Sequence, residues 1–82
     1  MKNSEGLPEF TSHLKKYRQL AGLTQEELAA RVHVRRETIL RLEAGRYNPS
    51  LKLAVDISRA VDAPIEAIFE FPEDEDAPAS IH

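Results

Sequence analysis

Two short runs of helical periodicity, separated by a tight turn, lie between Thr24 and Ser50. In the first run the apolar residues recur at helical spacing, at Leu28, Ala29 and Val32. Thr24 stands three residues before Glu27, and this spacing predicts a capping box at the start of a helix. Because the side chain of Ala29 is small, a second helix can cross closely there. The stretch therefore predicts two short amphipathic helices packed around a turn.

The second run has an apolar face and a mostly charged face. Its inward positions recur at helical spacing, at Val34, Thr38, Ile39 and Leu42. Gly45 follows as a natural left-handed cap, and Pro49 prevents the helix from continuing. The opposite face carries Arg35, Arg36, Glu37, Leu40 and Arg41.

Three motifs follow one another along the chain: LTQEELA, ETILRLEAG and YNPSLKLA, continued by the ending SLKLAVDISRAVDAPIEAIFEF. With them the chain resembles the Cro/cI/Xre family of helix-turn-helix transcriptional regulators, and most nearly its short stand-alone cytolysin-operon repressor type. The resemblance covers roughly residues 12–71. It implies an all-α, five-helix λ-repressor-like DNA-binding bundle, in which one helix braces against the DNA backbone and the next enters the major groove.

The resemblance also sets the expected boundaries of helices and segments. The five helices are expected near Thr11–Ala21, Gln25–Val32, Arg36–Glu43, Ser50–Val61 and Ile65–Phe69. The inner stripe of the first is expected at Leu14, Tyr17 and Ala21. Residues 9–11 and 69–71 are expected to pair as a small β-ribbon. The DNA-binding domain is then 9–71, between a disordered N-terminal arm over 1–8 and an acidic disordered tail over 72–82.

The resemblance assigns the exposed face of the second helix to DNA bases. Arg36 and Arg41 match positions that face base edges, where an arginine can bind guanine with two hydrogen bonds. Arg35 stands where the family usually has a capping Ser or Thr, so a phosphate contact is expected instead. Glu37 either accepts from cytosine N4 or complements the helix N-terminus electrostatically. Leu40 either meets a thymine methyl group or is an ordinary exposed leucine.

Further contacts are expected with the DNA backbone. Gln25 matches the family glutamine that binds a phosphate, beside the free amides of a helix N-terminus. Thr38 is expected to combine packing with a phosphate or thymine-methyl contact. The loop residues Arg46, Tyr47 and Asn48 match positions that also contact the backbone, and Lys52 either joins them or is a solvated helix charge.

Two family positions have structural roles. Arg18 and Glu43 match residues that pair beneath the motif and orient the second helix. His33 occupies the turn, where family members often carry Gly, so a positive φ is expected there.

The net charge of −3 is the wrong sign for binding phosphates, but its distribution is uneven. Residues 1–69 hold 11 basic and 9 acidic side chains, a balance of +2. Between Arg31 and Arg46 there are five arginines against Glu37 and Glu43, a local balance of +3. Because salt screens distant charge within about 8–10 Å, the local patch matters more than the total.

Several classes of function are excluded by composition. The chain has no cysteine, and its three histidines, His13, His33 and His82, are isolated from any catalytic or metal-binding partner, so neither an enzyme nor a metal site is expected. No cofactor and no small-molecule ligand are evident. No apolar run reaches membrane-spanning length, and MKNSEG is too polar for a signal peptide, so no membrane partner and a cytoplasmic location are expected.

The leading functional prediction is a homodimeric repressor that binds double-stranded DNA at a roughly palindromic operator. Its dimer interface is expected at Ile65, Ile68, Phe69 and Phe71, because this segment looks too short to bury all its apolar groups in one bundle. Two alternatives remain open. One is the antitoxin of a toxin–antitoxin pair, and the other is a protein-interaction module that lost DNA recognition, against which the arginine-rich face argues.

Overall fold

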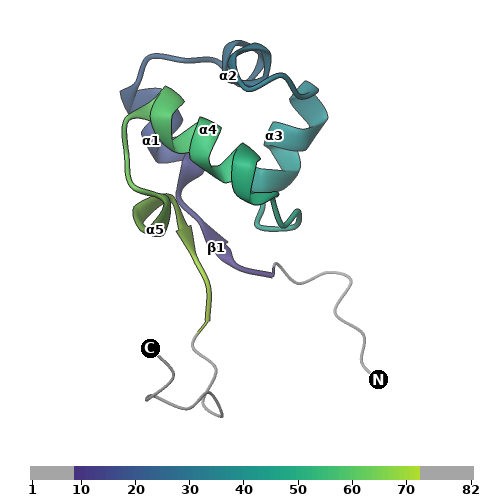
Figure 1. The fold of residues 1–82 in the computed structure, drawn as a ribbon, viewed down its shortest axis with the longest axis vertical. Coiled ribbons are helices and arrows are strands. Elements are labelled where there is room, and N and C mark those ends of the chain that lie inside the picture. The colour runs from purple at the N-terminus through teal and green to yellow at the C-terminus, as the bar shows by residue number, and fades with distance from the viewer. Residues whose placement is uncertain (1–8, 73–82) are drawn as a thin grey trace.

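The computed structural model describes residues 9–72, which form five helices and one two-stranded ribbon (Figure 1). In chain order the elements are β1 (Thr11–Ser12), α1 (Leu14–Leu20), α2 (Gln25–Arg31), α3 (Arg36–Glu43), α4 (Leu51–Val61), α5 (Ile65–Ile68) and β2 (Phe69–Glu70). The predicted all-α, five-helix class with a small ribbon is confirmed. The predicted arm over 1–8 and the predicted tail, apart from its first residue, lie outside the described residues.

The ribbon joins the two ends of the described chain. β1 and β2 are antiparallel, with Thr11 opposite Glu70 and Ser12 opposite Phe69. The ribbon, expected over residues 9–11 and 69–71, lies at Thr11–Ser12 and Phe69–Glu70. The first helix begins at Leu14 and not at Thr11 as predicted. Thr11 and Ser12 are extended because they pair with β2, and the Leu14 amide then donates to Ser12 Oγ at 3.3 Å.

The core collects side chains from all five helices. The largest fully buried side chains are Leu14, Leu28, Ile39, Leu42, Ile57 and Ile68. In α1 the predicted inner stripe is correct for Leu14 and for the half-buried Tyr17, which packs against the core, while Ala21 is exposed. Ala21 follows the last helical residue, so the helix ends before it can turn inward. Arg18 is buried in this helix instead.

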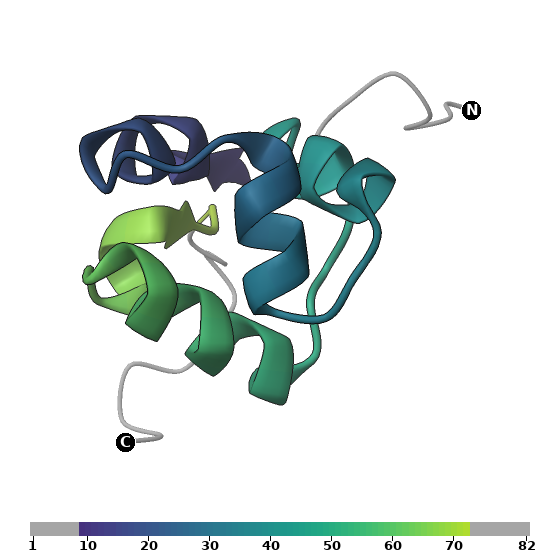
Figure 2. The same ribbon diagram turned by 90° about the horizontal axis from the view of Figure 1, so that it is seen from above.

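The predicted capping signals around α2 and α4 are confirmed. Glu27 N donates to Thr24 Oγ1 at 3.0 Å while Thr24 N donates to Glu27 Oε1 at 2.8 Å, which completes the capping box. Ser50 Oγ accepts from Leu53 N at 3.1 Å at the start of α4. His33, in the turn between α2 and α3, has a φ of 62°, the predicted left-handed conformation. The turn sets α3 beside α2 at one edge of the bundle (Figure 2).

Candidate nucleic-acid interface

The outer face of α3 is exposed along its whole length. Ile39 and Leu42 are 0% exposed and hold the inner face against the core, so the orientation of the helix is fixed. The predicted base-facing and phosphate-facing residues Arg35, Arg36, Glu37, Leu40 and Arg41 are all exposed. Thr38 is half-buried at the edge of this face. The structure therefore presents these side chains on one accessible helix surface.

The start of α3 differs from a conventionally capped helix. Arg35 is the N-cap residue with extended backbone, and its side chain makes no capping hydrogen bond. A guanidinium has no acceptor atom, so Arg35 cannot cap amides as Ser or Thr would. Its exposed side chain is therefore available to an external anion.

Arg18 and Glu43 form the predicted ion pair beneath α3. Arg18 Nε donates to Glu43 Oε2 at 2.5 Å, and Arg18 NH1 donates to the carbonyl oxygen of Leu23 at 2.8 Å. Both charged side chains are 9% exposed. Removing one partner of such a pair leaves a buried charge unpaired, which is strongly destabilising. The pair therefore holds α1 and the end of α3 together.

Gln25 also bonds to Glu43, a contact that was not predicted from the sequence. Gln25 Nε2 donates to Glu43 Oε1 at 3.0 Å from the first position of α2. The two residues are 18 positions apart and lie at opposite ends of the two-helix unit. No local spacing rule connects such positions, so the sequence carried no signal for this bond.

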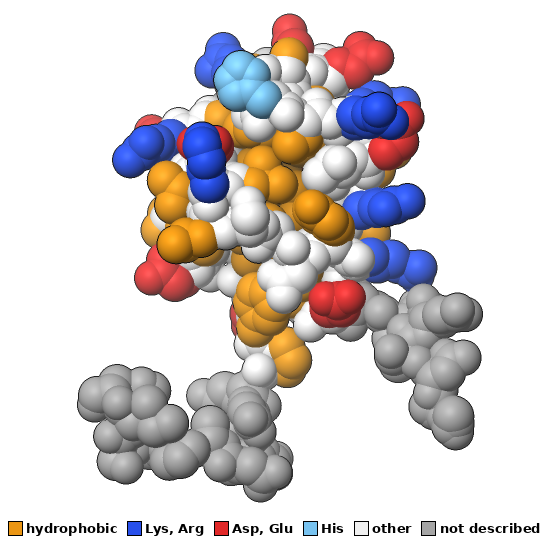
Figure 3. All heavy atoms as spheres, turned by 45° about the vertical axis from the view of Figure 1, so that its right-hand side comes forward, with side chains coloured by type: hydrophobic (Ala, Val, Ile, Leu, Met, Phe, Trp, Pro, Cys, Tyr) orange, Lys and Arg blue, Asp and Glu red, His pale blue; other side chains and the backbone are white. Residues whose placement is uncertain are grey.

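The loop after α3 extends the exposed surface. Arg46 and Asn48 are exposed, and Tyr47 is 40% exposed. The loop is held at its start, where Arg46 N donates to the carbonyl oxygen of Arg41 at 2.9 Å and Glu9 N donates to that of Gly45 at 2.6 Å. Figure 3 shows Lys and Arg side chains along the edge of the molecule that α3 forms.

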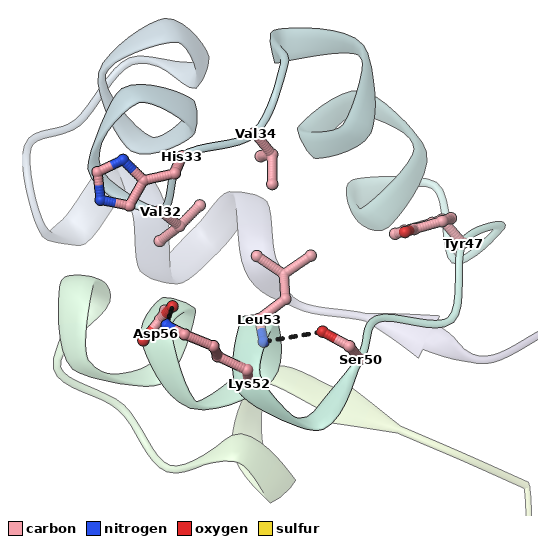
Figure 4. A pocket seen from close by; sticks show the side chains of 8 residues that line it. All are labelled: Val32, His33, Val34, Tyr47, Ser50, Lys52, Leu53 and Asp56. Atoms are coloured by element: carbon pink, nitrogen blue, oxygen red, sulfur yellow. Dashed lines mark hydrogen bonds and ion pairs between the residues drawn. The ribbon is translucent and has the colours of Figure 1, made fainter.

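A pocket of about 330 Å³ lies between the turn and the start of α4 (Figure 4). Leu53 points toward Val34 across it, and His33 and Tyr47 flank it on opposite sides. The remaining lining residues are Val32, Ser50, Lys52 and Asp56. Lys52 Nζ binds Asp56 Oδ2 at 2.8 Å, so the lysine charge is shared with a carboxylate. No pattern in the sequence predicted this pocket, because its lining residues come from separate elements of the fold.

The predicted dimer surface is wrong for two of its four residues. Ile68 is 0% exposed and Phe69 is 5% exposed, because α5 and β2 turn both side chains into the core. Phe69 packs edge-to-face on Phe10, with ring centroids 5.5 Å apart. Ile65 is half-buried, and Phe71 is 50% exposed while it stacks on Phe10 at 4.8 Å. Of the four predicted residues, Ile65 and Phe71 are the two that remain at least partly exposed.

Within residues 9–72, no group of three or more His, Asp or Glu side chains is placed to hold a metal ion. No helix in the same range is long and apolar enough to cross a membrane.

A two-helix unit whose second helix exposes arginines on its free face, packed in a five-helix bundle, defines a helix-turn-helix DNA-binding domain. The chain belongs to the Cro/cI-type helix-turn-helix family, whose model matches residues 14–68. This family is a non-enzymatic class of transcriptional regulators.

Relatives and solved structures agree with this membership. An HTH-type transcriptional regulator of Archaeoglobus fulgidus is 58% identical over 64 residues, covering 78% of this chain and 90% of the relative. Another, from Methanothermobacter thermautotrophicus, is 55% identical over 62 residues, covering 74% and 90%. The restriction-modification controller protein C.AhdI from Aeromonas hydrophila matches with a TM-score of 0.59 and 30% identity, over 65% of this chain and 80% of its own. The clp gene regulator ClgR from Corynebacterium glutamicum matches with a TM-score of 0.61 and 30% identity, over 66% and 69%.

Proposed function

We propose that this transcriptional regulator is a repressor that binds a roughly palindromic operator as a homodimer. The observation that carries the proposal is the exposed, arginine-rich face of α3, fixed in orientation by the buried Ile39 and Leu42. A rigid helix with charged side chains on its free face is suited to the major groove. The repressor role is supported by the resemblance to short stand-alone repressors.

Each exposed residue has a proposed role in this complex. Arg36 and Arg41 contact base edges, and Leu40, which is 39% exposed, contacts a thymine methyl group. Glu37 lies in the first turn of α3, where it complements the helix dipole or accepts from cytosine. Contacts that position the protein on the DNA backbone come from Gln25, Arg35, Thr38, Arg46, Tyr47 and Asn48.

Pairing of two chains is proposed because one recognition helix reads too few base pairs to select a genomic site. Ile65 and Phe71 supply the apolar surface for a twofold contact near α5 and the ribbon. Two recognition helices placed about 34 Å apart would enter successive major grooves on one side of the DNA.

Selection of bound sites from a pool of random double-stranded DNA tests the proposal. We expect a consensus with two inverted half-sites whose centres are about one helical turn apart. A single asymmetric half-site bound at full affinity would contradict the dimer. Recovery of no consensus at all would contradict sequence-specific recognition.

A further inference from the structure

The carboxylate of Glu43 lies between donors from two other helices. Its Oε2 accepts from Arg18 Nε of α1 at 2.5 Å, and its Oε1 accepts from Gln25 Nε2 of α2 at 3.0 Å. Glu43 is itself the last residue of α3, and its side chain is 9% exposed. One buried carboxylate therefore joins the recognition helix to both helices that precede it.

The chemistry of the carboxylate fixes which end of the Gln25 side chain faces it. An ionised carboxylate only accepts hydrogen bonds, so it selects the NH₂ end of the amide and excludes the carbonyl end. The NH₂ group has two N–H bonds, and the bond to Glu43 uses one of them. The second N–H stays on a nitrogen whose orientation is set, at the half-buried start of α2.

We infer that Glu43 is a positioning residue for DNA binding, and that it holds the Gln25 amide with its second N–H ready to donate to a backbone phosphate. The inference rests on the proposed function, in which Gln25 contacts the DNA backbone. Glu43 itself does not touch the DNA. Its contribution is to keep a donor, and not the amide oxygen, on the side that meets the phosphate.

For Glu43→Gln, this inference and a simple charge effect predict opposite changes in DNA affinity. Glu43→Gln removes a negative charge from the neighbourhood of the phosphates, so a charge effect alone would tighten DNA binding. A glutamine at this position has one acceptor oxygen where the carboxylate had two, and Arg18 competes for it. The NH₂ group of residue 43 then faces Gln25, which favours the flipped Gln25 amide and turns its oxygen toward the phosphate. Binding is therefore expected to weaken.

A double-mutant cycle on the full chain tests the inference, with binding to a short duplex of unrelated sequence and to the selected operator as readouts. Glu43→Gln and Gln25→Ala should each weaken binding to both duplexes roughly tenfold, the loss expected for one hydrogen bond to a charged group. The double variant should bind no more weakly than Gln25→Ala, because both changes remove the same contact. Glu26→Gln, an exposed change of equal charge in the first turn of α2, is the control and should not weaken binding.

Three outcomes would overturn the inference. The first is Glu43→Gln binding as tightly as the wild type or more tightly, and the second is losses that multiply in the double variant. The third is DNA binding that is intact but insensitive to Gln25→Ala, which would remove the Gln25 contact from the proposed complex and leave the repressor function standing. Failure of the wild type and of every variant to bind DNA would instead remove the proposed function, and this inference with it.

Glu43→Gln also weakens the pairing of Arg18, so a measurement on the wild type is needed if that variant does not fold. The heteronuclear NOE of the Gln25 side-chain NH₂ group in ¹⁵N NMR reports its order directly. We expect values as high as those of the α2 backbone in the free protein, and a large shift of this NH₂ signal when the duplex is added. A freely mobile side-chain amide in the free protein, or a signal that DNA does not move, would overturn the inference.

Discussion

Arg36 is the residue on which the proposed base recognition most depends. It is exposed at the first position of α3. Its neighbours Arg35 and Glu37 are exposed as well, so burial alone does not distinguish their roles. We expect these three residues to differ in the number and direction of their hydrogen bonds to DNA. Substituting each of them can measure that difference.

Arg36→Ala is expected to weaken binding to the selected operator by about 1–3 kcal/mol and to relax preference at one base pair of each half-site. The reason is the loss of a two-bond contact to guanine. Competition titrations with operators mutated at single base pairs measure both effects. Arg59→Ala, an exposed arginine on α4, is the control for the change in charge. Equal losses in the two variants, without altered base preference, would show that Arg36 contributes charge alone.

At the scale of elements, α2 depends on its ends because it has only seven residues. The capping box of Thr24 and Glu27 satisfies two backbone amides that the helix cannot satisfy internally. Leu28 and Ala29 then pack into the core and hold α2 against its neighbours. The turn that follows α2 then determines the position of α3.

Thr24→Ala is expected to lower the free energy of unfolding by about 1 kcal/mol, within a range of about 0.5–2 kcal/mol. Glu27→Ala should lower it by a smaller amount, because it removes the reciprocal bond and leaves the Thr24 cap. Urea unfolding followed by circular dichroism measures both variants. Glu26→Ala removes an equal charge from the same turn without touching the box, so a loss as large as that of Thr24→Ala would contradict this account.

At the scale of the whole molecule, the burial of Ile68 and Phe69 removes these two residues from the proposed dimer contact. A charged substitution at either position would disrupt the core of each chain. Its effect on association could then not be separated from its effect on folding. Phe71 stacks on Phe10 and still exposes half of its surface, so it is the better residue to change. Ile65, half-buried on α5, is the second.

Phe71→Glu, alone and with Ile65→Glu, is expected to give a folded monomer with greatly reduced operator affinity. A charge at an apolar contact opposes association, and a monomer forms only one half-site contact. Sedimentation equilibrium measures the mass, and circular dichroism reports the fold. Leu20→Glu, at a leucine that is 74% exposed near the end of α1, is the control and should leave the mass unchanged. A wild type that is already monomeric at the concentrations that saturate the full operator would contradict the proposal.

The sequence by itself determined the elements whose signals are local. Helical spacing predicted the inward Leu28, Ile39 and Leu42, the Thr24–Glu27 spacing predicted a capping box, and both are observed. The exposed arginines of α3 were predictable for the same reason, since a 3.6-residue period assigns both faces of a helix at once. The resemblance to a family added the Arg18–Glu43 pair and the ribbon.

Only the tertiary structure decided features that depend on residues distant in the chain. The ribbon strand is Thr11–Ser12 and not residues 9–11, and α1 begins only at Leu14, because Phe69 and Glu70 lie beside Thr11 and Ser12. Ile68 and Phe69 became core residues because α5 packs against the bundle, which the length of their own segment did not reveal. The Gln25–Glu43 bond exists because the turn at His33 brings the start of α2 to the end of α3. Hydrogen bonds and burial across such separations depend on the relative placement of helices, and no periodicity within a single segment specifies it.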